Sequence, residues 1–246
     1  MFFMKATDKI NEKMKDWKSD LQLGFVPSMI TVFAMTLGIH AIRFLFAGKI
    51  DMAMLCIAIA GVLDALDGKV ARYLQVSSKF GGTLDTLADF LNFGIVPAFA
   101  LYVKYAAAAN LKIYWLAVVV YIVSMALRLA RFSVIGMEDG KFFKGVPAPG
   151  AAFLVALPLC FEHAWYDFSP TFFAYMSFVM LLVMSLLMIS SFQTFSISRI
   201  SISKQYFGFL FIALAVAVSL LYAYTWDFII FIQLVYFISI FIKRVK

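Results

Sequence analysis

Long apolar stretches recur along almost the whole chain, and they restrict it to folds that satisfy their backbone hydrogen bonds inside a lipid bilayer. Each stretch is close to the roughly 20 residues that a helix needs to cross the hydrocarbon layer. Hydrophobic residues make up 64% of the 246 residues and charged residues only 14%, a composition that water-soluble domains do not have. We therefore expect an all-α membrane protein with about eight transmembrane helices. Their expected positions are roughly 26–47, 50–74, 83–107, 112–134, 147–165, 170–191, 205–224 and 227–243.

Residues 1–24 have a different pattern, in which lysines alternate with single apolar residues. The apolar side chains recur at steps of three and four, which predicts one apolar stripe along a helix. A basic amphipathic helix of this kind lies in the headgroup plane of a membrane, and a solvated coil is the alternative. The residues of the stripe are Phe3, Ala6, Ile10, Met14, Trp17 and Leu21. The predicted organisation is a juxtamembrane helix at 1–24 and one polytopic membrane domain at 25–246.

The basic residues predict the orientation of the spans. The net charge is +7, but the lysines and arginines lie in tails and in short segments between apolar stretches, so no nucleic-acid partner is expected. With about eight spans, most of these residues fall on the side that also holds both termini, and basic residues favour the cytoplasmic side. Both termini are therefore expected in the cytoplasm.

Four carboxylates stand out because they lie within or close to apolar helices. Asp64 and Asp67 come near the end of the second stretch, and Asp85 and Asp89 near the start of the third. A carboxylate in a membrane span normally pairs with a cation, faces a wet cavity or serves a function. Two readings remain open from the residues alone: a divalent-metal site, or a buried network in which lysines and arginines pair with the four acids.

The spacing of these acids places each pair on one face of its helix. Asp64 and Asp67 are three residues apart, and Asp85 and Asp89 are four apart. If the second helix returns beside the first, the two pairs can enclose one or two hard cations. Oxygen-only ligation favours Mg²⁺ or Mn²⁺, and two such ions could neutralise a diphosphate. Small side chains at Gly68 and Ala71, on the same face, would leave room for a phosphate or nucleotide.

The full pattern reads Asp64-x-x-Asp67-Gly68-x-x-Ala71-Arg72, eight residues, Gly81-x-x-x-Asp85-x-x-x-Asp89. It resembles the signature of the CDP-alcohol phosphotransferase family at every fixed position. The resemblance implies that an alcohol hydroxyl displaces CMP from a CDP-linked donor at a dimetal centre. It also implies a homodimer in a bacterial or archaeal cytoplasmic membrane. The orientation expected from the basic residues independently puts the acidic helix ends, and with them the active site, on the cytoplasmic side.

The same resemblance implies a role for each matching residue. Asp64, Asp67, Asp85 and Asp89 are the expected metal ligands, and Asp89 is the expected catalytic base. The nucleotide and its diphosphate are expected at a set of small, acidic and basic residues. This set is Asp67, Gly68, Ala71, Arg72, Gly81 and Lys144.

Flanking stretches resemble the membrane-embedded phosphatidylserine synthases of that family, which implies CDP-diacylglycerol as donor and L-serine as acceptor. They are Asp89–Ala98, Arg128–Phe132, Phe143–Pro149 and Leu187–Ser190. The chain departs from the usual pattern at Ser28, Asn92, Ser133 and Gly150. Arg128, Arg131 and Asn92 are expected to bind the acceptor, with an arginine facing the serine carboxylate.

Two other functions are weighed against serine transfer. The first is transfer to another alcohol such as choline, which has no carboxylate to engage Arg128 and Arg131. The second is a cation-coupled transporter that uses the aspartates as its ion site. A transporter site is expected near the middle of broken helices, whereas these aspartates lie near one end of their spans.

Overall fold

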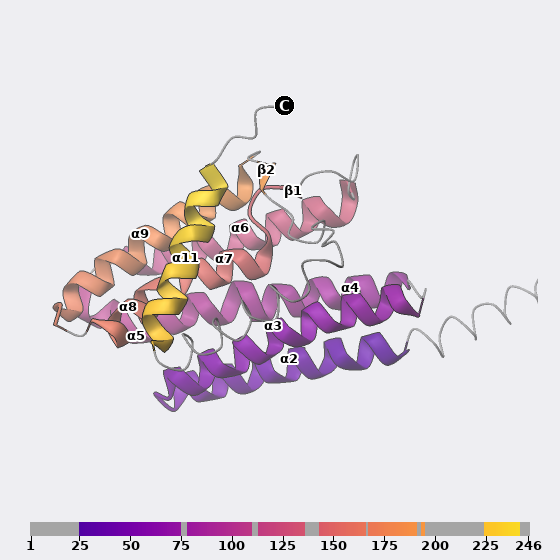
Figure 1. Cartoon of the computed structure of the whole chain (residues 1–246), viewed down its shortest axis with the longest axis horizontal. Helices are drawn as coiled ribbons and strands as arrows, with labels where there is room; N and C mark the ends of the chain where they lie inside the picture. The colour runs from indigo at the N-terminus through magenta and orange to yellow at the C-terminus, as the bar shows by residue number, and fades with distance from the viewer. Residues whose placement is uncertain are drawn as a thin grey trace, which may run out of the picture. The chain divides into compact units, whose positions relative to one another are not determined.

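A computed structural model describes residues 25–74, 78–109, 113–135, 143–165, 167–190, 193–194 and 224–241 (Figure 1). The predicted amphipathic helix at 1–24 lies outside these residues, as does the predicted span at 205–224 except for Tyr224. The chain divides into two compact units, Met1–Val96 and Pro97–Lys246. In order, the elements are α2 (Phe25–Phe46), α3 (Ile50–Tyr73), α4 (Lys79–Asp89), η1 (Phe90–Ile95), α5 (Val96–Ala109), α6 (Tyr114–Ile135), β1 (Phe143–Lys144), α7 (Ala148–Val155), α8 (Leu157–Ala164), α9 (Pro170–Ile189), β2 (Gln193–Thr194) and α11 (Thr225–Phe241).

The described helices have the length and composition of membrane spans. Four are long and apolar enough to cross a bilayer: Phe25–Phe46, Lys79–Ala108, Tyr114–Val134 and Pro170–Ile189. The helices at Ala148–Ala164 and Thr225–Phe241 are apolar but shorter. Large apolar side chains such as Phe25, Phe33 and Phe46 on α2 are exposed, as expected for surfaces that face lipid. The predicted helical membrane class is confirmed, whereas the total of about eight spans stays a prediction.

In the first unit, α2 packs along α3 through a stripe of mostly small residues. The buried positions of α2 recur at steps of three and four, so they occupy one face of the helix. Ala34 and Ala41 of this stripe, and Ala53 and Ala60 of α3, are almost completely buried. Small side chains allow two helix backbones to approach closely, which is how membrane helices associate without a hydrophobic driving force. The buried residues of α2 are Pro27, Ser28, Thr31, Ala34, Gly38, Ala41 and Leu45.

The connections of this unit are short and have local causes. α2 ends in a Schellman motif, in which the Lys49 N–H donates to Phe44 O at 2.9 Å and the Gly48 N–H to Leu45 O at 3.0 Å. Gly48 has the positive φ of 70° that this ending requires. At the start of α4, the Ser78 hydroxyl accepts a 2.8 Å hydrogen bond from the Gly81 N–H, as an N-cap. α4 thus begins at a defined residue and packs against α2 (Figure 1).

In the second unit, the segment expected as one span at 147–165 is two short helices, α7 and α8. The break follows from Pro158, which has no N–H to continue the helix. Gln233 of α11 lies at this break, where its Nε2 donates a 2.6 Å hydrogen bond to Phe153 O of α7. α6 packs on α9, and α11 packs on α8 and α7. The antiparallel pair β1–β2 joins Phe143 to Thr194 and Lys144 to Gln193.

Candidate functional site

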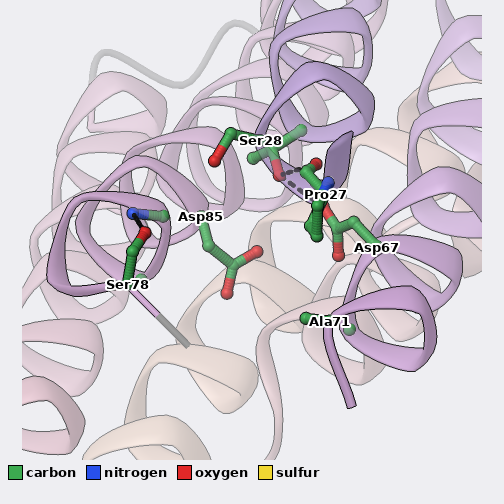
Figure 2. A pocket seen from close by; sticks show the side chains of 10 residues that line it. Pro27, Ser28, Asp67, Ala71, Ser78 and Asp85 are labelled. Carbon is green, nitrogen blue, oxygen red and sulfur yellow. Dashed lines mark hydrogen bonds between the residues drawn. The ribbon is translucent and has the colours of Figure 1, made fainter. Parts of the chain in front are cut away.

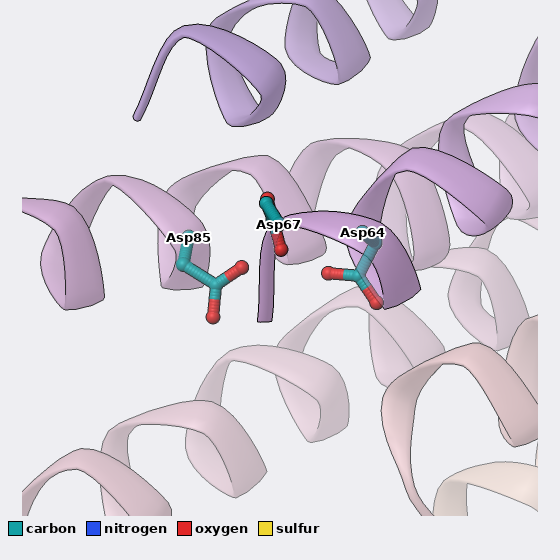
Figure 3. A group of neighbouring side chains, drawn as sticks. All are labelled: Asp64, Asp67 and Asp85. Atoms are coloured by element: carbon teal, nitrogen blue, oxygen red, sulfur yellow. The ribbon is translucent and has the colours of Figure 1, made fainter. Parts of the chain in front are cut away.

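Two neighbouring helices of the first unit bring carboxylates from distant parts of the sequence together. Asp64 and Asp67 lie one turn apart on α3, and Asp85 lies on α4 (Figure 3). Each of the three offers a carboxylate oxygen, and these oxygens all lie within 4.8 Å of one another. Asp67 is only 6% exposed, and the other two are partly buried. The second acidic helix therefore lies beside the first, as the sequence predicted.

Asp89 belongs to the same group. The carboxyl groups of Asp85 and Asp89 both lie within hydrogen-bonding reach of Asp64. All four aspartates singled out in the sequence thus meet in one place. Like charges at such separations repel one another strongly unless protons or cations are present between them.

The donor set fits a hard divalent cation. Oxygens bound to one Mg²⁺ at about 2.1 Å stand roughly 3 to 4.2 Å apart, and the larger Ca²⁺ allows slightly wider spacing. The 4.8 Å limit within which the oxygens of Asp64, Asp67 and Asp85 lie is close to that range. Carboxylates alone form this cluster, and oxygen-only ligation suits Mg²⁺ and Mn²⁺ better than zinc. The aspartate cluster therefore has the chemistry and the size of a divalent-metal site.

A pocket of about 210 Å³ lies directly against this cluster (Figure 2). Asp67 and Asp85 line it, and Figure 2 shows both carboxylates directed toward the same space. A methyl group added at Gly68 or Gly82 would meet no atom within 4 Å, so these glycines leave the space open. The complete lining is Pro27, Ser28, Thr31, Asp67, Gly68, Ala71, Ser78, Gly81, Gly82 and Asp85. Three residues predicted for the nucleotide, Gly68, Ala71 and Gly81, are among them.

The pocket also includes α2, which the sequence analysis did not assign to the site. Thr31 of α2 is buried, and its hydroxyl donates a 2.6 Å hydrogen bond to Oδ2 of Asp67. The same hydroxyl lies 3.1 Å from Pro27 O of its own helix. A hydroxyl has one proton, so the shorter, charge-assisted contact to the carboxylate is the dominant one. The sequence signal for this residue was a polar side chain, one turn after Ser28, inside an apolar span.

The basic residues expected in the site are divided between the two units. Arg72 lies at the end of α3 and is exposed, and it is not among the residues that line the pocket. Lys144, Arg128 and Arg131 belong to the second unit. Arg128 is 9% exposed on α6, and Arg131 donates a 3.2 Å hydrogen bond from Nη1 to Ile189 O at the end of α9. The backbone of Lys144 pairs with Gln193, and its side chain lies outside the described part of the chain.

Asn92, expected to bind the acceptor, lies in the first unit on η1. It is 1% exposed and donates a 3.2 Å hydrogen bond from Nδ2 to Ala34 O of α2. Its side chain is therefore directed at a neighbouring helix backbone.

Comparison with known proteins identifies a family and several similar proteins. A family model described as CDP-alcohol phosphatidyltransferase matches residues 24–242. The chain is 38% identical over 157 residues to a CDP-diacylglycerol–serine O-phosphatidyltransferase of Mycobacterium bovis, covering 59% of this chain and 54% of that protein. It is 32% identical over 168 residues to the Helicobacter pylori protein of the same name, covering 67% of this chain and 69% of the relative.

The match to the mycobacterial protein spans about half of that relative's length. The family match, in contrast, runs over nearly the whole of this chain and includes all four aspartates. The chain belongs to the CDP-alcohol phosphatidyltransferase family.

Proposed function

We propose that this protein transfers the phosphatidyl group of CDP-diacylglycerol to the hydroxyl of L-serine, giving phosphatidylserine and CMP. The observation that carries the proposal is the pocket against Asp67 and Asp85, whose glycine walls leave room beside a cluster of carboxylates. The names of the mycobacterial and Helicobacter relatives support serine as the acceptor.

We assign the donor to residues of the first unit together with Lys144 of the second. Asp64, Asp67, Asp85 and Asp89 would hold Mg²⁺ or Mn²⁺, with two ions expected. When bound, the cations would neutralise the diphosphate of the donor and polarise its phosphorus–oxygen bonds. Gly68, Ala71 and Gly81 would leave space for the CDP moiety, and Arg72 and Lys144 would contribute positive charge to its phosphates.

The reaction we propose is a single displacement at the phosphorus that bears the diacylglycerol. The serine hydroxyl oxygen forms the new bond to phosphorus while the bridging bond to CMP breaks. Asp89 accepts the hydroxyl proton, and CMP leaves with the bridging oxygen. The assignment of Asp89 as the base is supported by its position within hydrogen-bonding reach of Asp64, because a base must lie beside the reacting atoms.

We assign serine recognition to Arg128 and Arg131 on α6. The guanidinium of an arginine binds a carboxylate through two parallel N–H groups, which suits the carboxylate of serine. The burial of Arg128 supports a recognition role, because a buried guanidinium requires anionic or polar neighbours. Choline has no carboxylate and would make no use of these residues.

The remaining features of the proposal concern the whole chain. We propose an integral, multi-pass protein of a bacterial or archaeal cytoplasmic membrane, with about eight spans and an interfacial helix at 1–24. Both termini and the site would lie on the cytoplasmic side, in one polytopic domain over 25–246. We propose a homodimer as the working state.

The deciding experiment is an acceptor panel with the purified full chain in nanodiscs. CDP-diacylglycerol and Mn²⁺ or Mg²⁺ are supplied with labelled serine, choline, inositol or glycerol 3-phosphate, and CMP release and lipid product are both measured. We expect phosphatidylserine from serine alone, and no product after chelation by EDTA. Release of CMP with choline but not serine would overturn the acceptor, and no CMP release with any alcohol would overturn the transferase. The Asp85→Asn variant is the matched inactive control.

A further inference from the structure

The helix that carries Asp85 and Asp89 changes its winding directly after the second aspartate. Residues Phe90–Ile95 form one π-helical turn, η1, before the chain resumes as α5. Such turns are rare within α-helices and occur often at functional sites. Asn92, Phe93 and Gly94 of this turn are all buried. The turn is therefore packed into the first unit and has specific neighbours there.

Asn92 anchors this turn to the backbone of α2. Its Nδ2 donates to Ala34 O, across 58 positions of sequence, in a buried hydrogen bond of 3.2 Å. A Cβ built at Gly38, one turn further along α2, would overlap Oδ1 of Asn92. Only a glycine leaves room there, and its Cα hydrogen points toward that oxygen, a contact that recurs between closely packed helices. The asparagine amide thus spans one turn of α2 from Ala34 to Gly38.

The same face of α2 also holds the first acidic helix. Thr31, Ala34 and Gly38 are related by steps of three and four, and all three are buried. Thr31 contacts Asp67 of α3, while Ala34 and Gly38 contact Asn92. α2 is therefore in contact with both acidic helices over about two turns of one face.

We propose that Asn92 is a positioning residue, which seats η1 on Ala34 and Gly38 of α2 and thereby fixes the rotation of the helix that carries Asp85 and Asp89. This rotation sets how far the carboxylates of that helix lie from Asp64 and Asp67. Asn92 is three residues after Asp89 and seven after Asp85, so it shares their helix face up to the π-turn. A role of Asn92 in turnover rests on the proposed function, whereas its role in metal affinity does not.

The test measures Mn²⁺ binding to the purified full chain in detergent micelles, through the electron paramagnetic resonance signal of free Mn²⁺. Gly38→Ala pushes against Oδ1 of Asn92, and we expect its Mn²⁺ affinity to fall about tenfold or more, the usual effect of disturbing groups that orient metal ligands. The double variant Gly38→Ala/Asn92→Ser has a shorter side chain at the turn, and we expect it to return to the affinity of Asn92→Ser alone. Gly61→Ala is the matched control, because a Cβ there meets Phe93 only at an ordinary 3.6 Å.

Two results would overturn the proposal: wild-type Mn²⁺ affinity in Gly38→Ala, or a double variant that binds Mn²⁺ more weakly than Asn92→Ser alone. If Gly38→Ala does not accumulate in the membrane, Asn92→Ala decides, because it removes the anchor without a clash. Reduced Mn²⁺ affinity with an unchanged KM for serine supports the positioning role. Unchanged Mn²⁺ affinity with a raised KM for serine refutes it and assigns Asn92 to the acceptor. A wild-type protein that binds Mn²⁺ but releases no CMP would refute the proposed function, and the Mn²⁺ series would still decide the role of Asn92.

Discussion

Thr31 of α2 donates a 2.6 Å hydrogen bond to Oδ2 of Asp67 on α3, and this bond ties an apolar span to the most buried carboxylate of the cluster. It leaves the other carboxylate oxygen, Oδ1, for another partner. The carboxylate orientation is thus determined by a residue that bears no charge. Groups that orient metal ligands in this way influence affinity almost as much as the ligands themselves.

Replacement of Thr31 tests that influence. Thr31→Val keeps the shape of the side chain and removes the donor, so we expect Mn²⁺ affinity and CMP release to fall about tenfold. Thr31→Ser retains the hydroxyl and should remain within about threefold of wild type, well short of the roughly tenfold or greater loss that follows removal of an orienting group. Mn²⁺ titration of CMP release compares the two variants. Equal activity in Val and Ser variants would contradict a role for the hydrogen bond.

Removal of a carboxylate from the cluster should be more severe. Asp67→Ala and Asp85→Ala each remove one member of the group whose oxygens lie within 4.8 Å. We expect CMP release to fall below detection while the protein still inserts into the membrane, because the helices keep their apolar faces. Membrane fractionation and gel filtration in detergent report insertion and folding. Substantial CMP release from either variant would refute the assignment of the cluster as the metal site.

Asp89→Asn distinguishes a base from a ligand. If Asp89 accepts the serine proton, the amide cannot do so, and we expect kcat to fall by about 10²- to 10⁴-fold. Mn²⁺ binding should fall less, since Asp64, Asp67 and Asp85 remain. The measurement is kcat at saturating Mn²⁺ together with the Mn²⁺ dissociation constant. A fall in kcat of less than about tenfold would show that another group accepts the proton.

A close contact between Gly150 and Tyr236 in the second unit predicts that one substitution destabilises the fold and that a second one partly restores its stability. Gly150 of α7 packs closely on α11, and a Cβ there would overlap the hydroxyl of Tyr236 on α11. Gly150→Ala should therefore destabilise the fold by about 1–3 kcal/mol through overpacking. Gly150→Ala/Tyr236→Phe lacks the hydroxyl, the atom of Tyr236 that lies nearest to the added Cβ, and should recover part of that loss, while the ring carbons at 2.9 and 3.0 Å remain. Thermal unfolding monitored by gel filtration measures both variants, and a double variant as unstable as Gly150→Ala would contradict the contact.

Much of the architecture and of the site could be predicted from residue pattern. Apolar stretches predicted α2, α3, α6, α9 and α11 close to their observed positions, because a bilayer permits few alternatives to a helix. The segment at 147–165, expected as one span, is instead divided into α7 and α8. The spacing of Asp64, Asp67, Asp85 and Asp89 predicted two acidic helix faces, and the structure brings them together.

Other features could not be predicted, because they depend on how each helix is rotated about its axis. The π-turn at η1 has no residue signature, since it arises from a shift of backbone hydrogen bonds. Arg72 shares a sequence motif with Asp67 but lies exposed at the helix end, outside the pocket lining. The contact of Asn92 with Ala34 depends on packing between segments 58 positions apart.

The sequence by itself determined the membrane environment and the helical class, and it identified the four carboxylates, because apolar length and charge position carry that information locally. Only the tertiary structure decided that α2 completes the site. Thr31 and Gly38 are an ordinary threonine and glycine in an apolar span until α3 and η1 pack against them. Their roles arise from contacts between helices, and those contacts exist only once close packing has fixed the rotation of each helix.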